Sequence, residues 1–183
     1  MVNIVPGGRD IGAYLVQHRD IDKIAFTGST AAGRQIAEVC GRLLRPVSLE
    51  LGGKSAGWSP VGAPGLDAGW FVEPTVFADV DNSSVIAQEE IFGPVLSVIP
   101  YQDTDDAIRI ANESDYGLGG SVWTSDPERA REVCRRVRTG TMGINGFLPD
   151  PAGPWGGVKS SGIGRELGPG AVAAYQQLKT IYA

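Results

Sequence analysis

The chain has 183 residues, of which 42% are hydrophobic and 20% are charged, and its formal net charge is -5. These proportions are ordinary for a globular protein, and the acidic balance argues against nucleic-acid binding, which needs a basic patch. No apolar run reaches the roughly 20 residues of a membrane-spanning helix, so we expect neither a membrane nor a nucleic acid as partner. The 2 cysteines lie far apart in the sequence, which argues against a disulfide framework and favours a cytoplasmic location.

The first part of the chain alternates between apolar runs and helical patterns. The runs are rich in β-branched or aromatic residues and predict strands at residues 2–5, 24–26 and 47–51. Apolar stripes with helical spacing lie between them, one marked by Ile11 and Leu15 and the next by Ile36 and Cys40. Alternating strands and helices imply a parallel sheet with right-handed crossovers. We therefore predict an α/β fold that begins with half of a doubly wound, Rossmann-like domain.

The second part of the chain repeats this alternation. Its predicted elements are a strand at 95–99, a helix at 103–112, a strand at 121–123, a helix that begins at 126–127, a strand at 142–145, a last helix at 170–178 and an extended tail at 179–182. The first of these strands is apolar throughout, as expected for a strand covered on both faces. Asp126 and Pro127 suit the N-cap and the first position of a helix.

The turn after the strand at residues 24–26 contains Gly28 and Ser29. Free backbone N–H groups at the positive end of the following helix suit a pyrophosphate, and glycine permits a close approach. A serine in this position is also a common helix N-cap, so both roles remain open. The spacing differs from G-x-G-x-x-G, so the generic dinucleotide fingerprint is absent.

Six blocks of the sequence form a recognisable series, at residues 26–33, 50–55, 89–95, 116–118, 139–145 and 156–162. In this order they resemble the motifs of the NAD(P)-dependent aldehyde dehydrogenase superfamily. Several blocks in the right order are more specific than any single short motif, so the chain is identified as a member of this family. The resemblance implies NAD or NADP as cofactor and a small aldehyde as substrate.

The resemblance also implies roles for individual residues. Glu50 matches the general base of the family, and the residues matched to cofactor contacts are Gly28, Ser29, Leu51, Glu90 and Phe92. Read without the family, Glu90 could be an exposed acid and Phe92 a core residue. Glu50 could likewise be a strand-end acid with no nucleophile to deprotonate.

The catalytic cysteine of the family is missing from this chain. In the family it follows the glutamate motif by a few dozen residues in a Gly-Gln-x-Cys setting, whereas here no cysteine follows Glu50 until Cys134. Cys40 and Cys134 lie outside such a motif, and a buried cysteine acts more often as a small hydrophobe than as a nucleophile. We therefore expect an internally deleted and N-terminally shortened member that lacks the catalytic-cysteine segment and is inactive alone.

The expected organisation follows from this deletion. Residues 1–56 form a partial cofactor-binding region, residues 57–69 a Gly/Pro-rich junction, and residues 70–167 the C-terminal part of an aldehyde-dehydrogenase-like catalytic α/β domain. Residues 168–183 are expected to form a helix and a strand that joins subunits into homo-oligomers or mixed oligomers. Two alternatives stay open: a non-catalytic nucleotide-binding or oligomerisation module that associates with full-length homologues, and a non-functional gene remnant.

Overall fold

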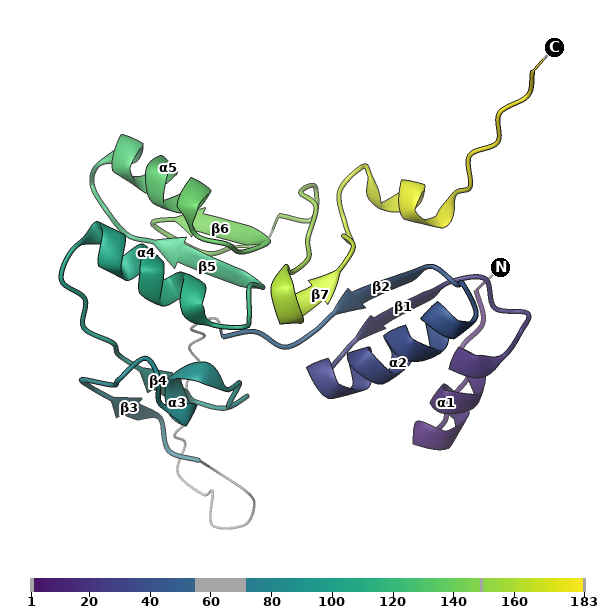
Figure 1. Ribbon diagram of the computed structural model, residues 1–183, viewed down its shortest axis with the longest axis horizontal. Coiled ribbons are helices and arrows are strands. Elements are labelled where there is room, and N and C mark those ends of the chain that lie inside the picture. Colours follow the sequence, from purple (N-terminus) through teal and green to yellow (C-terminus); the bar gives the residue numbers. More distant parts are fainter. Residues whose placement is uncertain (1, 55–71, 149, 183) are drawn as a thin grey trace.

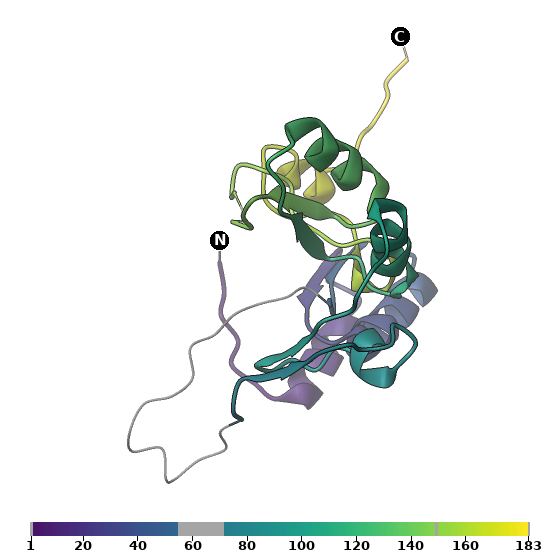
Figure 2. The ribbon, with the colours of Figure 1, turned by 90° about the vertical axis from the view of Figure 1, so that its left-hand side faces the viewer.

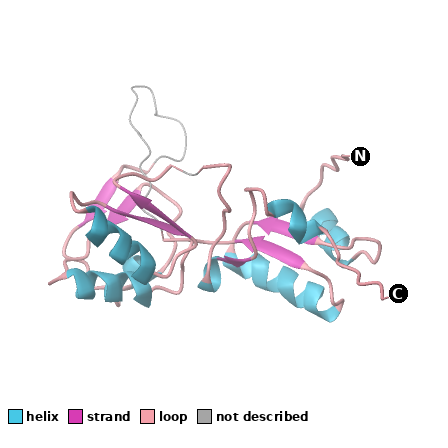
Figure 3. Ribbon diagram, turned by 90° about the horizontal axis from the view of Figure 1, so that it is seen from above, coloured by secondary structure: helices cyan, strands magenta, loops and turns pink. Residues whose placement is uncertain are grey.

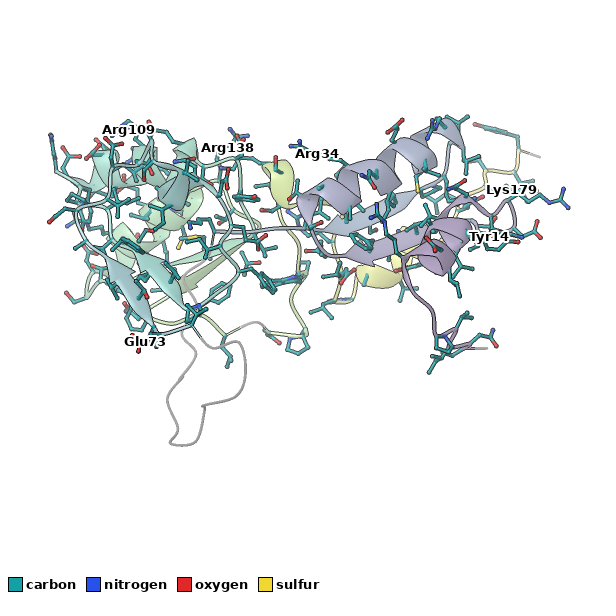
Figure 4. All side chains as sticks on the ribbon, turned by 90° about the horizontal axis from the view of Figure 1, so that it is seen from below. Tyr14, Arg34, Glu73, Arg109, Arg138 and Lys179 are labelled. Atoms are coloured by element: carbon teal, nitrogen blue, oxygen red, sulfur yellow. The ribbon has the colours of Figure 1, made fainter. Side chains whose placement is uncertain are left out.

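The described residues of the computed structural model, 2–54, 72–148 and 150–182, form two lobes side by side (Figures 1 and 3). The first lobe contains α1 (Arg9–Gln17), β1 (Ile24–Thr27), α2 (Thr30–Arg42) and β2 (Val47–Glu50). The second lobe contains β3 (Thr75–Phe77), α3 (Val85–Gln88), β4 (Val95–Ser97), α4 (Thr104–Glu113), β5 (Gly119–Val122), α5 (Pro127–Arg136) and β6 (Thr141–Ile144). Tyr14 of the first lobe and Arg109 of the second lie toward opposite ends of the molecule (Figure 4).

The first lobe is built on a parallel strand pair. β1 pairs with β2 in register from Ile24 opposite Val47 to Thr27 opposite Glu50, and α2 is the crossover helix between them. Leu49 and Cys40 are fully buried between β2 and α2. The predicted strand–helix–strand unit is therefore confirmed. A third strand, β7 (Gly162–Ile163), pairs antiparallel with β2, which the parallel prediction did not include.

The second lobe contains two separate parallel pairs. β3 pairs with β4, and β5 pairs with β6, but within the described part of the chain the two pairs are not hydrogen-bonded to each other. Figure 2 shows the β3–β4 ribbon apart from the β5–β6 sheet. The α/β class is confirmed in the form of small parallel sheets with helices packed against them.

Two helices of this lobe begin where the sequence predicts. The Asp103 side chain accepts a hydrogen bond of 2.9 Å from the Asp106 N–H, and Asp126 accepts one of 2.9 Å from the Glu128 N–H. Each aspartate is thus an N-cap that satisfies an otherwise unpaired donor of the first turn.

Some predicted elements are wrong. Residues 2–5 are exposed and form no strand, because no neighbouring strand is present among the described residues to pair with them. The strand predicted at 95–99 ends at Ser97, and Leu96 is 43% exposed, so it is not covered on both faces. The last helix is a 3₁₀ helix limited to Ala171–Tyr175, stabilised by contacts of Tyr175 with Lys23.

Residues 176–182 are extended, and no sheet partner for them lies in the described structure. Pairing of this tail with a neighbouring subunit stays a prediction. The junction predicted at 57–69 lies outside the described residues. Over the described ranges, no helix has both the length and the apolar character needed to cross a membrane.

A connecting segment, residues 155–163, joins the lobes. It contains the 3₁₀ helix η1 (Lys159–Ser161) and β7. The Ser161 carbonyl accepts from the Leu51 N–H at 2.9 Å, and the Ser161 hydroxyl donates to the Gly52 carbonyl at 2.5 Å. The same hydroxyl accepts from the Gly117 N–H of the second lobe at 2.9 Å. One buried serine therefore ties the end of β2 to the turn before β5.

Candidate functional site

Glu50 is the last residue of β2, at the carboxyl edge of the parallel pair. Its backbone carbonyl accepts a hydrogen bond of 3.0 Å from the Gly28 N–H, and its side chain is only 4% exposed. The carboxylate lies against Gly156, where a Cβ atom would come within 2.7 Å of Glu50 Oε1. Gly156 also has a φ of +154°, which disfavours other residues. The connecting segment thus leaves room for one carboxylate at this edge.

The electrostatic setting of Glu50 favours a neutral carboxyl. Neither carboxylate oxygen has a hydrogen bond of normal geometry within the described structure. Burial, assisted by the nearby Glu166 charge, raises the pKa of Glu50 from 4.5 to about 7. The Arg165 charge and the Gly157 N–H oppose it. A carboxyl that titrates near neutral pH can exchange a proton as a general base or acid.

The turn from β1 into α2 forms a second part of the site. The Ser29 hydroxyl accepts from the Ala32 N–H at 3.2 Å, and the Ser29 carbonyl accepts from the Gly33 N–H at 2.9 Å. Ser29 is therefore a helix N-cap, one of the two roles its position allowed. The N–H groups of Thr30 and Ala31 have no partner within the described ranges. These donors at a positive helix end are available to an anion.

Leu51 and Gly33 hold this turn against β2. A Cβ atom on Gly33 would come within 2.4 Å of Leu51 Cδ2, so a larger residue at position 33 would require the Leu51 side chain to move. Leu51 is buried there. Its side chain is used in packing, and a contact between Leu51 and a cofactor would have to come from its backbone carbonyl. That role stays a prediction.

Glu90 reaches the same edge from the second lobe. Its Oε1 accepts a hydrogen bond of 3.2 Å from the Gly53 N–H. A Cβ atom on Gly52 would come within 2.5 Å of Glu90 Oε2, 3.1 Å of Tyr116 Cε1 and 3.2 Å of Thr30 Oγ1. The structure thus brings Glu90 and Tyr116 next to the first turn of α2. Glu90 is half-buried, which excludes its interpretation as a fully exposed acid.

Phe92 lies two residues further on, in a different setting. It is 94% exposed and has a φ of +53°, an uncommon backbone conformation for an aromatic residue. Its interpretation as a core residue is wrong, because no described element packs over it. Its predicted contact with a cofactor ring stays a prediction.

The two cysteines lie away from Glu50. Cys40 is fully buried near the far end of α2, about 15 Å along the helix from the first turn at 1.5 Å per residue. Burial raises its thiol pKa, with Arg45 opposing, which disfavours the reactive thiolate. Cys134 is half-buried on α5 in the second lobe. In the described ranges no cluster of histidine, cysteine, aspartate or glutamate could hold a metal ion.

Sequence reasoning missed several residues of this site. The connecting segment supplies Ser161, Gly156 and Gly157 around Glu50, and Arg165 and Glu166 supply the nearby charges. A usable signal was present, since glycines at 156, 157 and 162 mark a backbone that other chain segments approach closely. Their partner could not be read from the sequence, because more than a hundred residues separate Ser161 from Gly52.

Comparison with known proteins agrees with this geometry. The sequence model described as the aldehyde dehydrogenase family matches residues 1–59 and 57–181. The chain belongs to the aldehyde dehydrogenase family. It is 42% identical to a geranial dehydrogenase of Castellaniella defragrans, covering all of this chain and 57% of that protein. It is 32% identical to a betaine aldehyde dehydrogenase of Brucella ovis, covering 57% of that protein. The chain therefore spans little more than half the length of these relatives.

Solved structures of aldehyde dehydrogenases also match this chain over part of their own length. An aldehyde dehydrogenase of Mycobacterium tuberculosis complexed with NAD+ matches 94% of this chain, with a TM-score of 0.88 and 34% identity, over 55% of its own length. An NAD+ complex of an aldehyde dehydrogenase from Bacillus cereus matches with a TM-score of 0.87 and 30% identity, over 54% of its length. Both lobes thus resemble parts of one enzyme in their relative placement.

Proposed function

We propose that this chain is a non-catalytic aldehyde dehydrogenase polypeptide, one that keeps a general base and a cofactor-facing turn but does not oxidise aldehydes alone. The observation that carries this proposal is a buried Glu50 carboxyl with a pKa of about 7 and neither cysteine of the chain beside it. Without a nucleophile the covalent pathway cannot operate at all, which is a larger loss than the slowing of one step.

The domain assignment is part of this proposal. We assign residues 1–56 to half of a doubly wound cofactor domain and residues 70–167 to the C-terminal part of the catalytic domain, with 57–69 as their junction. Residues 168–183 would be the oligomerisation element. The parallel β1–α2–β2 unit and the two parallel pairs of the second lobe support the first two assignments.

The residues at the site fit a dinucleotide. The unpaired N–H groups of Thr30 and Ala31 suit phosphate oxygens, and the Glu90 carboxylate can accept from ribose hydroxyls beside Gly52. Bound NAD or NADP would supply a hydride acceptor. The Mycobacterium tuberculosis and Bacillus cereus relatives are described as NAD+ complexes, which favours NAD. Glu50 would hold or accept a proton at its buried oxygens.

We infer the substrate class from the aldehydes named for two relatives. Geranial dehydrogenase of Castellaniella defragrans is 42% identical to this chain, and a mutant aldehyde dehydrogenase of Pseudomonas syringae in complex with NAD+ and octanal is 28% identical. We propose that the ancestral substrate was an apolar aldehyde of this kind.

A turnover assay tests the main proposal. Purified protein with NAD+ or NADP+ and either geranial or octanal should form no NADH or NADPH above background, while a full-length relative does so under the same conditions. Aldehyde-dependent turnover would contradict the proposal. Loss of that turnover in Cys40→Ser or Cys134→Ser would then identify the nucleophile.

A nucleotide-binding role is the second candidate, favoured by the contact of Glu90 with Gly53 next to the first turn of α2. Calorimetry should give NAD+ binding weaker than micromolar. Glu90→Gln should weaken it about fivefold, since a lost hydrogen bond costs on the order of 1 kcal/mol. Glu89→Gln is the matched control, because Glu89 is an exposed neighbour. Micromolar affinity that Glu90→Gln leaves unchanged would rule out this use of the site.

A further inference from the structure

One edge of β1 in the first lobe has no strand partner. β1 pairs with β2 alone, and in the part of the chain that the structure describes no strand lies on its other side. The N–H groups of Ile24 and Gly28 donate to carbonyls on the β2 side, at 3.2 and 3.0 Å. Because backbone groups alternate in direction along a strand, those of Ala25 and Thr27 point away from β2. Both residues are exposed, so this edge of β1 is open to solvent.

Helix α1 lies beside the open edge and leaves its apolar face uncovered. In Figure 1, α1 lies next to α2, on the side of β1 that faces away from β2. Ile11 and Leu15 are four positions apart and share one face of the helix, yet they are 43% and 36% exposed. None of the residues of α1, all of which are described, is buried. A strand added to the edge of β1 would lie beside this face and give it apolar contacts.

Arg45, in the loop between α2 and β2, holds α1 in this position. Its buried guanidinium donates to the carbonyls of Val16 and His18 at the end of the helix, at 2.5 and 2.6 Å. These charge-assisted hydrogen bonds attach the helix end to the strand pair. The open edge of β1 and the apolar face of α1 are therefore held next to each other.

The chain carries an exposed segment that suits this edge. Residues 2–5, with the sequence Val-Asn-Ile-Val, are rich in β-branched side chains, and Figure 2 shows them projecting from the first lobe. Val2 is 91% exposed and Ile4 is 89% exposed. In a strand these two side chains would share one face, so both can pack against one apolar surface. Gly7 and Gly8 then link the segment to α1 and permit a change in its direction.

The connection through α1 determines where this segment can pair. Residues 2–5 are joined to β1 through α1, just as β1 is joined to β2 through α2, and the two helices pack beside each other. Right-handed crossovers through helices on one face of a sheet place successive strands side by side and parallel. A strand formed by residues 2–5 therefore belongs on the edge of β1 away from β2. Within one molecule the segment stands free of this edge, so the edge can accept the same segment from a second molecule.

We propose that two copies of this chain exchange residues 2–5, each copy adding this segment as a parallel strand to the open β1 edge of the other. The backbone groups of Ala25 and Thr27 then gain partners, and Val2 and Ile4 pack against α1. An exchange of identical elements is reciprocal, so it closes as a twofold dimer and covers both open edges. The proposal concerns association alone and needs neither turnover nor nucleotide binding. It also uses the opposite end of the chain from the oligomerisation element assigned to residues 168–183.

Sedimentation and hydrogen exchange of the full chain test the exchange. Analytical ultracentrifugation should show a monomer that converts to a dimer, and to nothing larger, as the protein concentration is raised. Hydrogen exchange at the amides of Ala25 and Thr27 should slow at least tenfold in the dimer relative to the dilute monomer. The amides of Ile24 and Phe26 are the internal control, because they face β2 in both states.

Three variants locate the contact. Ile4→Lys places a charge on the exchanged segment and should raise the dimer dissociation constant at least tenfold. Ala25→Pro should do the same, because it removes an N–H that faces the partner strand, and proline is tolerated on a strand edge. Leu178→Lys is the matched control for Ile4→Lys: Leu178 is 102% exposed, lies in the tail, and should leave the dimer unchanged. All three dilute variants should keep the circular dichroism of the parent chain.

Four results would overturn the proposal. They are a chain that stays monomeric at every concentration, a dimer that Ile4→Lys or Ala25→Pro leaves intact, a dimer that Leu178→Lys weakens equally, and slow exchange at Ala25 and Thr27 in the dilute monomer. The last result would show that each molecule pairs with its own segment. Association is measured without aldehyde or cofactor, so its failure leaves the turnover proposal standing. Turnover by the chain would contradict that proposal without affecting this one.

Discussion

The connecting segment and the β3–β4 ribbon differ in how deeply they are buried and in how many other segments of the chain contact them. Around the connecting segment, Ser161 is fully buried and Glu50 is 4% exposed, and backbone groups of both lobes are hydrogen-bonded to the same serine. On the ribbon, Val76 is 63% exposed, and the two strands have each other as their only strand partners within the described structure.

The β3–β4 ribbon is the less supported of these two regions. A pair of strands is at best marginally stable alone, because most of its apolar surface stays in water. The carboxyl edge at Glu50 depends on segments that this chain retains, including β1, α2 and β7. The β4 strand of the ribbon instead borders a cavity of about 650 Å³. The site residues are therefore expected to be the more rigid part of the molecule.

The largest expected contrast is between two glycines. A Cβ atom at Gly140 would come within 1.5 Å of the Gly156 carbonyl oxygen, whereas at Gly93, before β4, the nearest atom is Ile91 Cγ2 at 3.9 Å. Gly140→Ala should lower the free energy of unfolding by about 3 kcal/mol or more, and Gly93→Ala should change it by about 0.5 kcal/mol or less. Urea unfolding measures both, and equal effects would contradict the comparison.

A pair of serines gives the next contrast. Ser161→Ala leaves the Gly52 carbonyl and the Gly117 N–H without their buried partner, which should cost about 2–3 kcal/mol of unfolding free energy. Ser97→Ala on the ribbon removes a half-buried hydrogen bond of 3.2 Å to the Ile86 carbonyl and should cost about 0.5–1 kcal/mol. Thermal unfolding of both variants checks the order. A costlier Ser97→Ala would show that the ribbon is the better-supported region.

The third effect concerns pH. The pKa of Glu50 in the folded chain, about 7, lies above its ordinary value of 4.5, so the folded state holds the proton more tightly than the unfolded state. The resulting stabilisation is fully present below pH 4.5 and is lost as the pH rises through 7. Between pH 5 and 8 it should fall by about 2.5 kcal/mol.

Glu50→Gln isolates this contribution, because the amide does not titrate. Urea unfolding of the parent chain and the variant is compared at several pH values from 5 to 8. The unfolding free energy of the parent chain relative to the variant should fall by that amount as the pH rises. Parallel curves would show that Glu50 is not the buried, proton-holding group described above.

Much of the fold could be predicted from local patterns. The strands at Ile24–Thr27 and Val47–Glu50 and the N-caps Asp103 and Asp126 were predictable, because periodicity and capping depend on residues a few positions apart. Residues 2–5 have the same apolar character as a strand but form none, since a strand needs a partner that local sequence does not reveal. β7 was missed for the related reason that its two residues pair with a strand more than a hundred positions away.

The features of the site also divide into those that the sequence predicts and those that depend on the folded structure. Three features could be read from the sequence: the residues that carry the family resemblance, the ability of Ser29 to cap α2, and the absence of a cysteine between Glu50 and Cys134. Three features depend on the folded structure: the Glu50 carboxyl is buried without a hydrogen bond of normal geometry, Glu90 contacts Gly53, and Phe92 is exposed. Burial and pKa depend on contacts between segments that are distant in the chain, whereas motifs and helix caps depend on residues a few positions apart.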